Sequence, residues 1–359
     1  MQPLGLVVGT LLLLLVGWES FETIVLPRRV SRRFRLTRAF YRATWIPLRA
    51  VGSRFPPGTM RESFLSVYGP ISLILLLGTW AVLLVLGFAL LHWGAGSHVV
   101  APAGLHGFAA DLLLSGATLS TLSLEGVTAG TVLERVFGAG EALMGLAFFA
   151  LVIGYLPVVS QAFSRREVNV TLLDARAGSP PSAGELLVRH VDFEQEQTLA
   201  QLLQQWDRWS ADLLETHVSF PVLAYYRSQH DNQSWVAALT TVLDVCALII
   251  AGLERQPLPS ARLAFAMARH AAVDLSRTFG LPPLPPVTDR LTPGELARLR
   301  AALLAAGLSP REGREVDEKL RRLRQMYEPY MNALGEFLLM PLPTWVSQEG
   351  SQDNWQATR

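Results

Sequence analysis

The chain has 359 residues, of which 50% are hydrophobic and 17% charged, and its formal net charge is +1. Its mean hydropathy of +0.29 exceeds that of ordinary water-soluble domains, so membrane-spanning segments are expected. The single cysteine, Cys246, excludes an intramolecular disulfide framework and any cysteine-rich metal site.

The first apolar segment is predicted to be a membrane helix over residues 3–25. Residues 3–18 are uncharged, and no basic residue precedes Arg28. A cleaved signal peptide would need a basic start and a small-residue cleavage site, and this segment has neither. Glu19 and Glu22 then lie near the inner end of the helix. They either reach the membrane interface or pair with the arginines that follow.

A basic segment follows over residues 27–66. Ten arginines and no acidic residue occur between Arg28 and Arg61, and such a block beside a membrane helix is retained in the cytoplasm. Aromatic residues such as Phe34 and Trp45 lie between the arginines. This pattern is compatible with nucleic-acid binding, but an interfacial helix on anionic lipid explains it more simply. We therefore expect membrane lipid as a partner and no nucleic acid.

Two further membrane helices are predicted. Residues 70–93 form 24 positions without a formal charge, enough to cross about 30 Å of hydrocarbon. His92 and Trp93 are expected at the outer membrane interface. The third helix runs from about 133 to 163. Residues 94–132 between them contain no lysine or arginine, which predicts that this segment lies outside the cell.

The stretch DLLLSGATLSTLSLEG, residues 111–126, lies between these two helices and is too short to span a bilayer. We expect a short helix over about 107–120, followed by a polar extended tail. This is the pore-loop arrangement of a cation channel, tolerated at membrane depth only where its free backbone lines a wet cavity or is buried in protein. The carboxyl end of such a helix carries partial negative charge that favours a cation.

The residues SGATLST, 115–121, resemble the pore helix of the two-transmembrane potassium-channel family. The resemblance covers about residues 70–166, and it includes Val127-Thr128 and the motif EALMG at 141–145. It implies a homotetramer, because each chain supplies one pore loop, with cations as permeant ions. Residues 153–168 and 172–182 are also similar to bacterial channel-like proteins.

The expected filter departs from the family pattern Thr-x-Gly-Tyr-Gly-Asp. Serine and glutamate occupy the two glycine positions and leucine the tyrosine position, and a non-glycine residue resists the left-handed backbone by about 1–2 kcal/mol. A ring of Glu125 carboxylates at the outer mouth predicts a non-selective or divalent-permeable pore. Alternatively, Glu125 faces bulk water and the pore is closed or vestigial. The filter residues are predicted to be Thr121, Leu122, Ser123, Leu124, Glu125 and Gly126.

Two residues of the third helix are further candidates. Glu141 lies about two turns inside the outer end, where an ionisable group is costly and is a functional candidate. It either supports the pore helix through Thr118 or Ser120 or faces a wet crevice. Gly145 is the candidate gating hinge, since the inner helix of related channels bends at such a glycine; close packing of small residues is the alternative.

The remainder is predicted to comprise a linker over 167–182, a helical domain over 183–340 and a flexible tail over 341–359. Capping residues Ser182 and Thr292 precede two of its helices. Residues 235–253 could form a fourth membrane span, but Asp244 at the centre favours a buried helix of the bundle. The expected helices are 185–209, 235–253, 260–279 and 312–339.

Chemical motifs are sparse. His270 and Asp274 share a helix face, and His230, Asp231 and Asp244 could complete a metal site in the bundle core, but no spacing signature supports it. The sequence contains no nucleotide-binding glycine loop, nucleophile elbow or HExxH motif. We expect no enzyme activity, metal or cofactor.

The sequence thus predicts an all-α membrane protein. It would have a first transmembrane helix over 1–26, a pore domain over 67–166 with two helices around a re-entrant pore loop, and a cytoplasmic helical bundle. The expected function is a cation channel in the cell membrane, multi-pass, with a cytoplasmic C-terminal domain. The alternative is a non-conducting channel homologue that acts as a membrane-anchored sensor or interaction protein.

Overall fold

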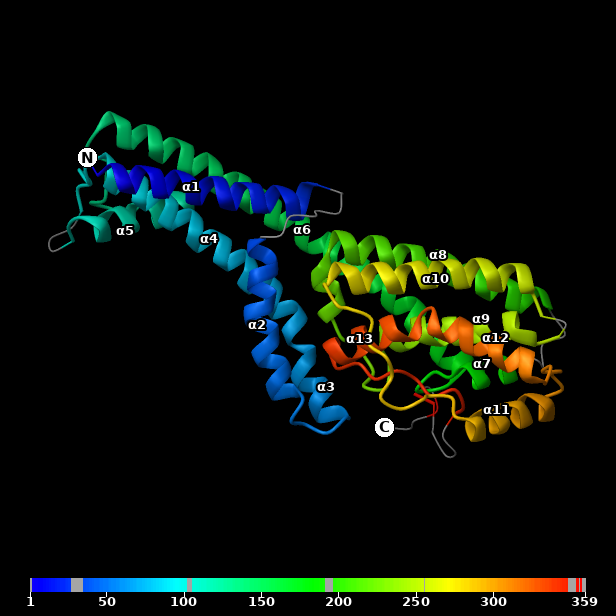
Figure 1. Ribbon diagram of the computed structural model, residues 1–359. Helices are drawn as coiled ribbons and strands as arrows, with labels where there is room; N and C mark the ends of the chain where they lie inside the picture. The colour runs from blue at the N-terminus through cyan, green and yellow to red at the C-terminus, as the bar shows by residue number, and fades with distance from the viewer. Residues whose placement is uncertain are drawn as a thin grey trace. The chain divides into compact units, whose positions relative to one another are not determined.

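The structure is a computed structural model, and every regular element among the residues it describes is a helix (Figure 1). Those residues are 2–26, 35–101, 105–190, 196–254, 256–347, 353–354 and 356. The chain divides into two compact units: residues 1–46 with 70–160, and residues 47–69 with 161–359. Within the described ranges, β pairing is limited to single bridges, Val100–Thr128 and Leu253–Pro310. The all-helical prediction is confirmed.

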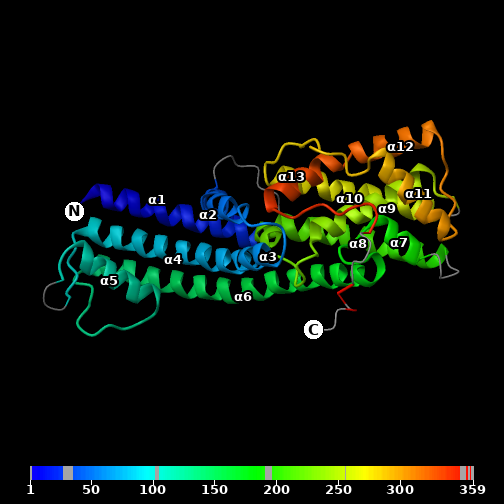
Figure 2. The same ribbon diagram turned by 90° about the horizontal axis from the view of Figure 1, so that it is seen from below.

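The first unit is built from long apolar helices. In Figures 1 and 2 the helices α1, α4 and α6 run side by side and the short helix α5 lies along them. Helix α6 passes its predicted end near residue 163 because helix-forming residues continue as far as Gly178, whose φ of 85° ends the run. The elements are α1 (Pro3–Ser20) with a π-helical turn (Phe21–Val25), α2 (Leu36–Gly52), α4 (Tyr68–Ala95), α5 (Phe108–Leu119) and α6 (Val132–Ala177). The ends of α2 and α6 and the start of α4 belong to the second unit.

Glycines allow α1 and α4 to pack closely. Gly5 and Gly9 lie one turn apart and are both buried. A Cβ on Gly9 would lie 2.6 Å from the backbone oxygen of Gly87, and one on Gly5 would lie 2.9 Å from that of Leu90. Such small-xxx-small contacts are a common way for helices to associate in a membrane, where apolar burial gives no driving force.

Large apolar side chains stay exposed on the outer faces of these helices, among them Leu11, Ile74, Leu143 and Ile153. Surfaces of this kind are typically covered by lipid or by another protein chain. Within the described part of the chain, four helical segments are long and apolar enough to cross a membrane: Pro3–Ile24, Thr59–Ala95, Val132–Ala177 and Trp235–Gly252.

The glutamates near the end of α1 make local contacts. Both carboxylate oxygens of Glu19 accept hydrogen bonds from backbone N–H groups at the start of α2, Leu36 at 3.0 Å and Thr37 at 3.2 Å. Glu22 accepts from the Trp18 indole at 2.6 Å and lies 3.9 Å from the Arg35 guanidinium. Pairing with an arginine therefore holds for Glu22, whereas Glu19 caps a helix. Arg28, Arg29, Arg32 and Arg33 lie outside the described residues.

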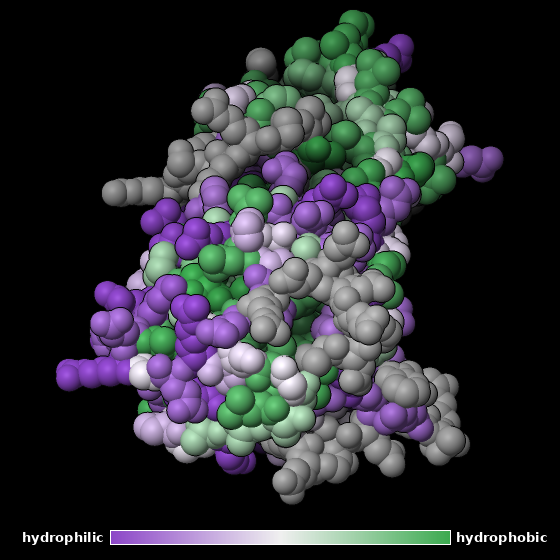
Figure 3. Space-filling model, turned by 90° about the vertical axis from the view of Figure 1, so that its right-hand side faces the viewer, coloured by the Kyte–Doolittle hydropathy of each residue, from purple (hydrophilic) through white to green (hydrophobic). Residues whose placement is uncertain are grey.

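The second unit is a helical bundle around α9 (Trp235–Gly252), which is buried along nearly its whole length, as the bundle-core interpretation of 235–253 predicts. Helices α7, α10, α12 and α13 contact it, and α8 lies along α10 (Figure 1). The surface of this unit that faces the viewer in Figure 3 mixes hydrophilic and hydrophobic side chains. The other elements are α3 (Thr59–Ser66), α7 (Ala183–Arg189), α8 (Glu196–Ser219), a 3₁₀ turn (Pro221–Tyr225), α10 (Leu258–Thr278), α11 (Pro293–Ala305), α12 (Arg314–Gln325) and α13 (Glu328–Leu338).

Several predicted boundaries in this unit were wrong. The helix expected over 185–209 is two helices, since α7 ends at Arg189 and α8 begins at Glu196. The helix expected over 312–339 is also two, with Pro329 in the first turn of α13. The linker expected over 167–182 is helical as far as Ala177.

The segment after α13 is also more ordered than the predicted flexible tail over 341–359. Trp345 is 1% exposed, and its backbone oxygen accepts a hydrogen bond from Gly184 at 2.9 Å. Asp353 pairs with Arg189 at 2.9 Å. Residues 341–347 are therefore part of the bundle, while 348–352, 355 and 357–359 lie outside the described residues.

Both predicted caps are confirmed. The Ser182 hydroxyl accepts from the Glu185 backbone at 3.3 Å. Thr292 and Glu295 exchange hydrogen bonds in a complete capping box, with Pro293 at the first helical position.

Arginines fix the short connections of the second unit. Arg166 of α6 is 2% exposed and donates to the backbone oxygens of Leu223 at 2.7 Å and Tyr226 at 2.9 Å. Arg227 donates to the Leu339 oxygen at 3.2 Å and to the Glu62 carboxylate at 3.1 Å. Burial lowers the pKa of Arg227 to about 10, against the opposing effect of Glu62. These bonds join the turn after α8 to α6, α3 and the end of α13.

A buried ionic network crosses the bundle core. Asp244 is 0% exposed and its two oxygens accept from Arg290 at 2.9 and 3.1 Å. Arg290 also donates to Glu328 at 2.8 Å, and the Tyr327 hydroxyl donates to Asp244. Burial alone would lower the pKa of Arg290, but the adjacent carboxylates, Asp244 first, raise it above its ordinary value. Asp244 therefore has a cationic partner within the bundle.

Replacing Arg290 by leucine should destabilise the bundle by about 3–5 kcal/mol, because it leaves the Asp244 carboxylate buried without a cation. Urea unfolding of the detergent-solubilised full-length protein measures the effect. Arg298→Leu is the matched control: that side chain is 71% exposed and 3.9 Å from Glu295, so it should cost less than about 1 kcal/mol. Equal unfolding midpoints for the two variants would contradict the prediction.

Candidate pore-loop site

Helix α5 matches the short helix predicted over 107–120. It begins after Gly107, whose φ of 63° suits a residue without a side chain. Asp111 lies in its first turn, where a negative charge complements the helix dipole. Ala110, Ala117 and Leu119 are buried. The apolar, small-residue composition seen in the sequence thus forms a helix that packs within the first unit.

The carboxyl end of α5 is closed by a turn at Thr121. The backbone N–H of Leu122 donates to the Ala117 oxygen at 2.8 Å, and that of Thr121 donates to the Thr118 oxygen at 3.0 Å. This pair of bonds is the Schellman pattern, which requires a left-handed residue and usually uses glycine. Here Thr121 has φ of 56°. A β-branched residue in this region is an outlier, and such strain is concentrated at functional positions.

All six predicted filter residues are exposed in the isolated chain. Leu122 is 64% exposed and Leu124 is 39% exposed. Within this segment, whose backbone is fully described, positive φ occurs only at Thr121 and Gly126. Ser123 and Glu125 therefore lack the left-handed conformation that glycine adopts in the family's filter. The potassium-type alternation of backbone conformation is absent from residues 121–126.

The loop that carries these residues is fixed at both ends. Val100 and Thr128 exchange two backbone hydrogen bonds of 2.9 Å. Glu134 is 0% exposed and accepts from the backbone N–H groups of His98 at 2.8 Å and Thr131 at 3.0 Å. The Thr131 hydroxyl accepts from the Glu134 N–H at 3.3 Å, which completes a capping box at the start of α6. The sequence TVLE at 131–134 carries this signal, which sequence reasoning alone did not use.

Glu141 contacts α5, but through a different residue from the two expected. The Ser115 hydroxyl is in hydrogen-bond contact with Glu141 Oε1. The prediction of Thr118 or Ser120 as the partner was wrong, because Ser115, about one turn nearer the start of α5, is the buried hydroxyl, whereas Thr118 is half-buried and Ser120 exposed. Glu141 is 0% exposed, so the wet-crevice alternative does not describe its position in the isolated chain.

Two more polar contacts surround Glu141. The Ser115 hydroxyl also lies 2.8 Å from the backbone oxygen of Val85 on α4. His92 of α4 is 0% exposed, and its Nε2 lies 3.6 Å from Glu141 Oε2. His92 is therefore buried within the first unit, and its predicted level at the outer membrane interface stays a prediction. No local sequence pattern indicates this burial, because the burial of His92 depends on the packing of α4 against α6.

Gly145, the predicted hinge, lies where α6 meets the end of α5. A Cβ at this position would overlap the backbone oxygen of Leu119. The helix runs without interruption through this residue. The close-packing alternative therefore describes its contact in the structure, and its role as a gating hinge stays a prediction.

The backbone carbonyl groups at the end of α5 already contact other backbone atoms of the chain. The Ala117 and Thr118 oxygens accept hydrogen bonds from the closing turn, and the Leu119 oxygen lies against Gly145. Helix α5 can still present the negative end of its dipole. The side chains of Thr121, Ser123 and Glu125 provide exposed oxygen atoms beyond that end, and oxygen ligands suit hard cations.

Several of the residues predicted as metal-ligand candidates in the bundle form ion pairs with other side chains. His270 and Asp274 form an ion pair on the bundle surface, 3.2 Å apart, and no group of three or more metal-ligating side chains occurs among the described residues. Asp244 is engaged by Arg290 and not by His230.

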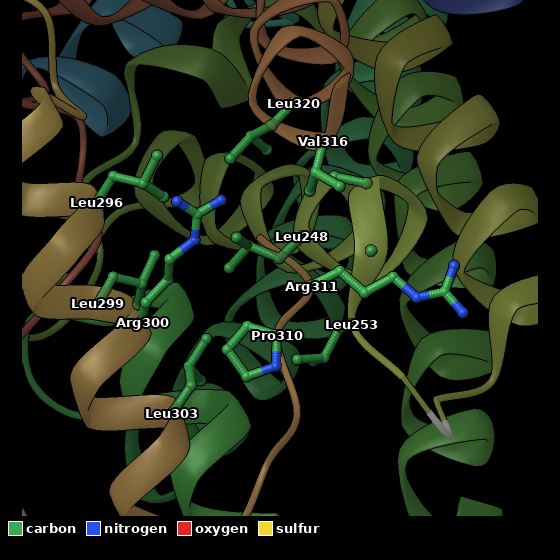
Figure 4. A pocket seen from close by; sticks show the side chains of 12 residues that line it. Leu248, Leu253, Leu296, Leu299, Arg300, Leu303, Pro310, Arg311, Val316 and Leu320 are labelled. Atoms are coloured by element: carbon green, nitrogen blue, oxygen red, sulfur yellow. The ribbon is translucent and has the colours of Figure 1, made fainter. Parts of the chain in front are cut away.

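A small cavity lies between α9, α11 and α12 in the bundle. Its space of about 20 Å³ suits a water molecule, far below the several hundred Å³ of a ligand pocket. Leucine side chains line it, and the guanidinium of Arg311 points away from it (Figure 4). This cavity is therefore a packing defect.

No protein-family model, curated protein or solved structure matches this chain. Function is therefore inferred from the geometry of its own residues. The feature with the most distinctive geometry is α5 with its closing turn and its buried contact to Glu141.

Replacing Gly145 by alanine should lower the stability of the first unit by about 1–3 kcal/mol, because the new methyl group would overlap the Leu119 backbone oxygen. Thermal unfolding in one detergent measures this. Gly138→Ala on the same helix is the control, since nothing lies within 4 Å of its Cβ position; it should be neutral or stabilising by up to about 1 kcal/mol. Identical melting of both variants would show that α5 does not pack at Gly145.

Proposed function

We propose that this chain is a subunit of a homotetrameric cation channel of the cell membrane. Helices α1 and α4 and the first part of α6 would span the bilayer, and α5 with residues 121–126 would form a re-entrant pore loop. The arginine-rich segment 28–61 favours a cytoplasmic location for α2 and the C-terminal bundle. Lipid would cover the outer apolar faces.

The observation that carries this proposal is the construction of the pore loop. A short apolar helix lies between two long ones, is tied to α6 by a buried carboxyl group, and ends in a strained turn at Thr121. The polar segment that follows is exposed in one chain. Four such segments around an axis would place hydroxyl and carboxylate oxygens where a cation passes.

The same segment favours a pore unlike that of a potassium channel. Without left-handed backbone at Ser123 and Glu125, successive carbonyl rings do not form, so selectivity would depend on side-chain oxygens. Rings of acidic side chains are used by cation-selective pores. We therefore propose a non-selective or divalent-permeable channel with Glu125 at its outer mouth.

A second candidate function is a non-conducting channel homologue that acts as a membrane-anchored sensor or interaction protein. The exposed side chains of Leu122 and Leu124 favour it, because four copies of each could close the axis with apolar groups. The helical bundle would then bind the partner.

Glu125→Gln should change the relative permeability of the channel to potassium, sodium and calcium, because it removes the carboxylate ring that attracts cations. Ion flux from proteoliposomes under each gradient measures this, with the largest loss expected for calcium. Glu312→Gln, at an exposed position of the bundle, is the control and should behave as wild type.

Folded, tetrameric protein that gives no flux under any gradient would favour the non-conducting alternative. Cation flux that Glu125→Gln leaves unchanged would overturn the role of Glu125. A flux of potassium alone would show that the filter works without its glycines.

A further inference from the structure

The contact between α4, α5 and α6 contains three polar side chains removed from water. His92, Ser115 and Glu141 are each 0% exposed. Neither ring nitrogen of His92 makes a hydrogen bond to the described residues, and neither does Glu141 Oε2. Ionisable groups inside membrane helices are costly and usually functional. This cluster is therefore more than a packing contact.

Whether Glu141 carries a proton can be inferred from the two contacts of the Ser115 hydroxyl. Its oxygen contacts Glu141 Oε1 and lies 2.8 Å from the Val85 backbone oxygen. A backbone carbonyl only accepts, and a hydroxyl has one proton to donate. If Ser115 donates to Val85, its contact with Glu141 is a hydrogen bond only when the carboxyl group carries a proton and donates it.

The ionised alternative leaves one contact unsatisfied. If Ser115 donated to a Glu141 carboxylate, its oxygen would face the Val85 oxygen without a hydrogen between them. Two buried oxygens that face each other without a hydrogen bond cost free energy, and this cost disfavours the ionised form of Glu141. A neutral Glu141 satisfies both contacts and links α6 to α5 and α5 to α4.

We propose that Glu141, Ser115 and His92 form a proton-binding site that holds α5 between α4 and α6 while Glu141 carries its proton. When the proton leaves Glu141, the chain of hydrogen bonds to Val85 loses its first link. His92 Nε2 lies 3.6 Å from Glu141 Oε2 and is the polar atom described nearest to that oxygen.

The other titratable groups near this site belong to α5, α6 and the preceding loop. Asp111 of α5 is 0% exposed and interacts electrostatically with His92, Glu134 and His98. Glu134 differs from Glu141 because backbone N–H groups donate to both of its oxygens, which fits a carboxylate. The two glutamates of α6 are thus predicted to differ in protonation at the same pH.

Infrared spectroscopy of the full-length protein in lipid tests the site directly. Wild type at neutral pH should show a protonated-carboxyl band that shifts in D₂O, and Glu141→Gln should remove the component of this band that comes from Glu141. Glu134→Gln is the matched control on the same helix and should keep the band. The absence of the band in wild type, or a band of unchanged intensity in Glu141→Gln, would overturn the proposal.

Two further variants test the partners. Ser115→Ala should shift the band because the acceptor of the Glu141 proton is lost, whereas Ser120→Ala at an exposed position should not. His92→Gln should also shift the band, because it changes the polar group that lies 3.6 Å from Glu141 Oε2. An unchanged band in both Ser115→Ala and His92→Gln would contradict the proposed cluster.

The consequence for transport rests on the proposed channel function. Cation flux should depend on pH in wild type and lose this dependence in Glu141→Gln, whose amide donates to Ser115 at every pH. The infrared result does not require conduction, so failure of the channel proposal and failure of the proton site are distinguishable. A flux with the same pH dependence in both proteins would overturn the proposed coupling.

Discussion

The polar contacts that join Glu141, Ser115 and Val85 link the short helix α5 to both of its long neighbours, α4 and α6. Helix α5 has only about three turns with which to pack against two long neighbours, so a polar contact removed from water sets its level along α4 and α6. Gly145 then allows the end of α5 to approach α6 at the Leu119 oxygen. Together these contacts set where the exposed segment beginning at Thr121 leaves the helix.

The buried carboxyl groups of this protein differ in the hydrogen-bond donors and cations that surround them, and their roles differ accordingly. Glu19 and Glu134 accept backbone N–H groups at helix starts and so satisfy groups that a helix leaves unpaired. Asp244 is balanced by Arg290 in the bundle core. Glu141 has neither a backbone donor nor an arginine among the described contacts, and its polar neighbours are Ser115 and His92.

Much of the first unit could be predicted from sequence. The helices around 3–25 and 70–93 follow from uncharged runs of bilayer length, and α5 from a short apolar stretch between long ones. In the second unit the capping residues Ser182 and Thr292 located two helix starts. The breaks within 185–209 and 312–339 were missed, and Trp345 was assigned to a tail because its burial depends on residues distant in sequence.

Composition and the lengths of the uncharged runs were enough to establish the helical class and the apolar segments, and the sequence itself shows serine and glutamate at positions 123 and 125. The contact of Ser115 with Glu141 and the burial of His92 beside them emerged only from the packing of the folded chain. Side chains on α4, α5 and α6 meet through the relative height and rotation of three helices, and no local pattern encodes those quantities.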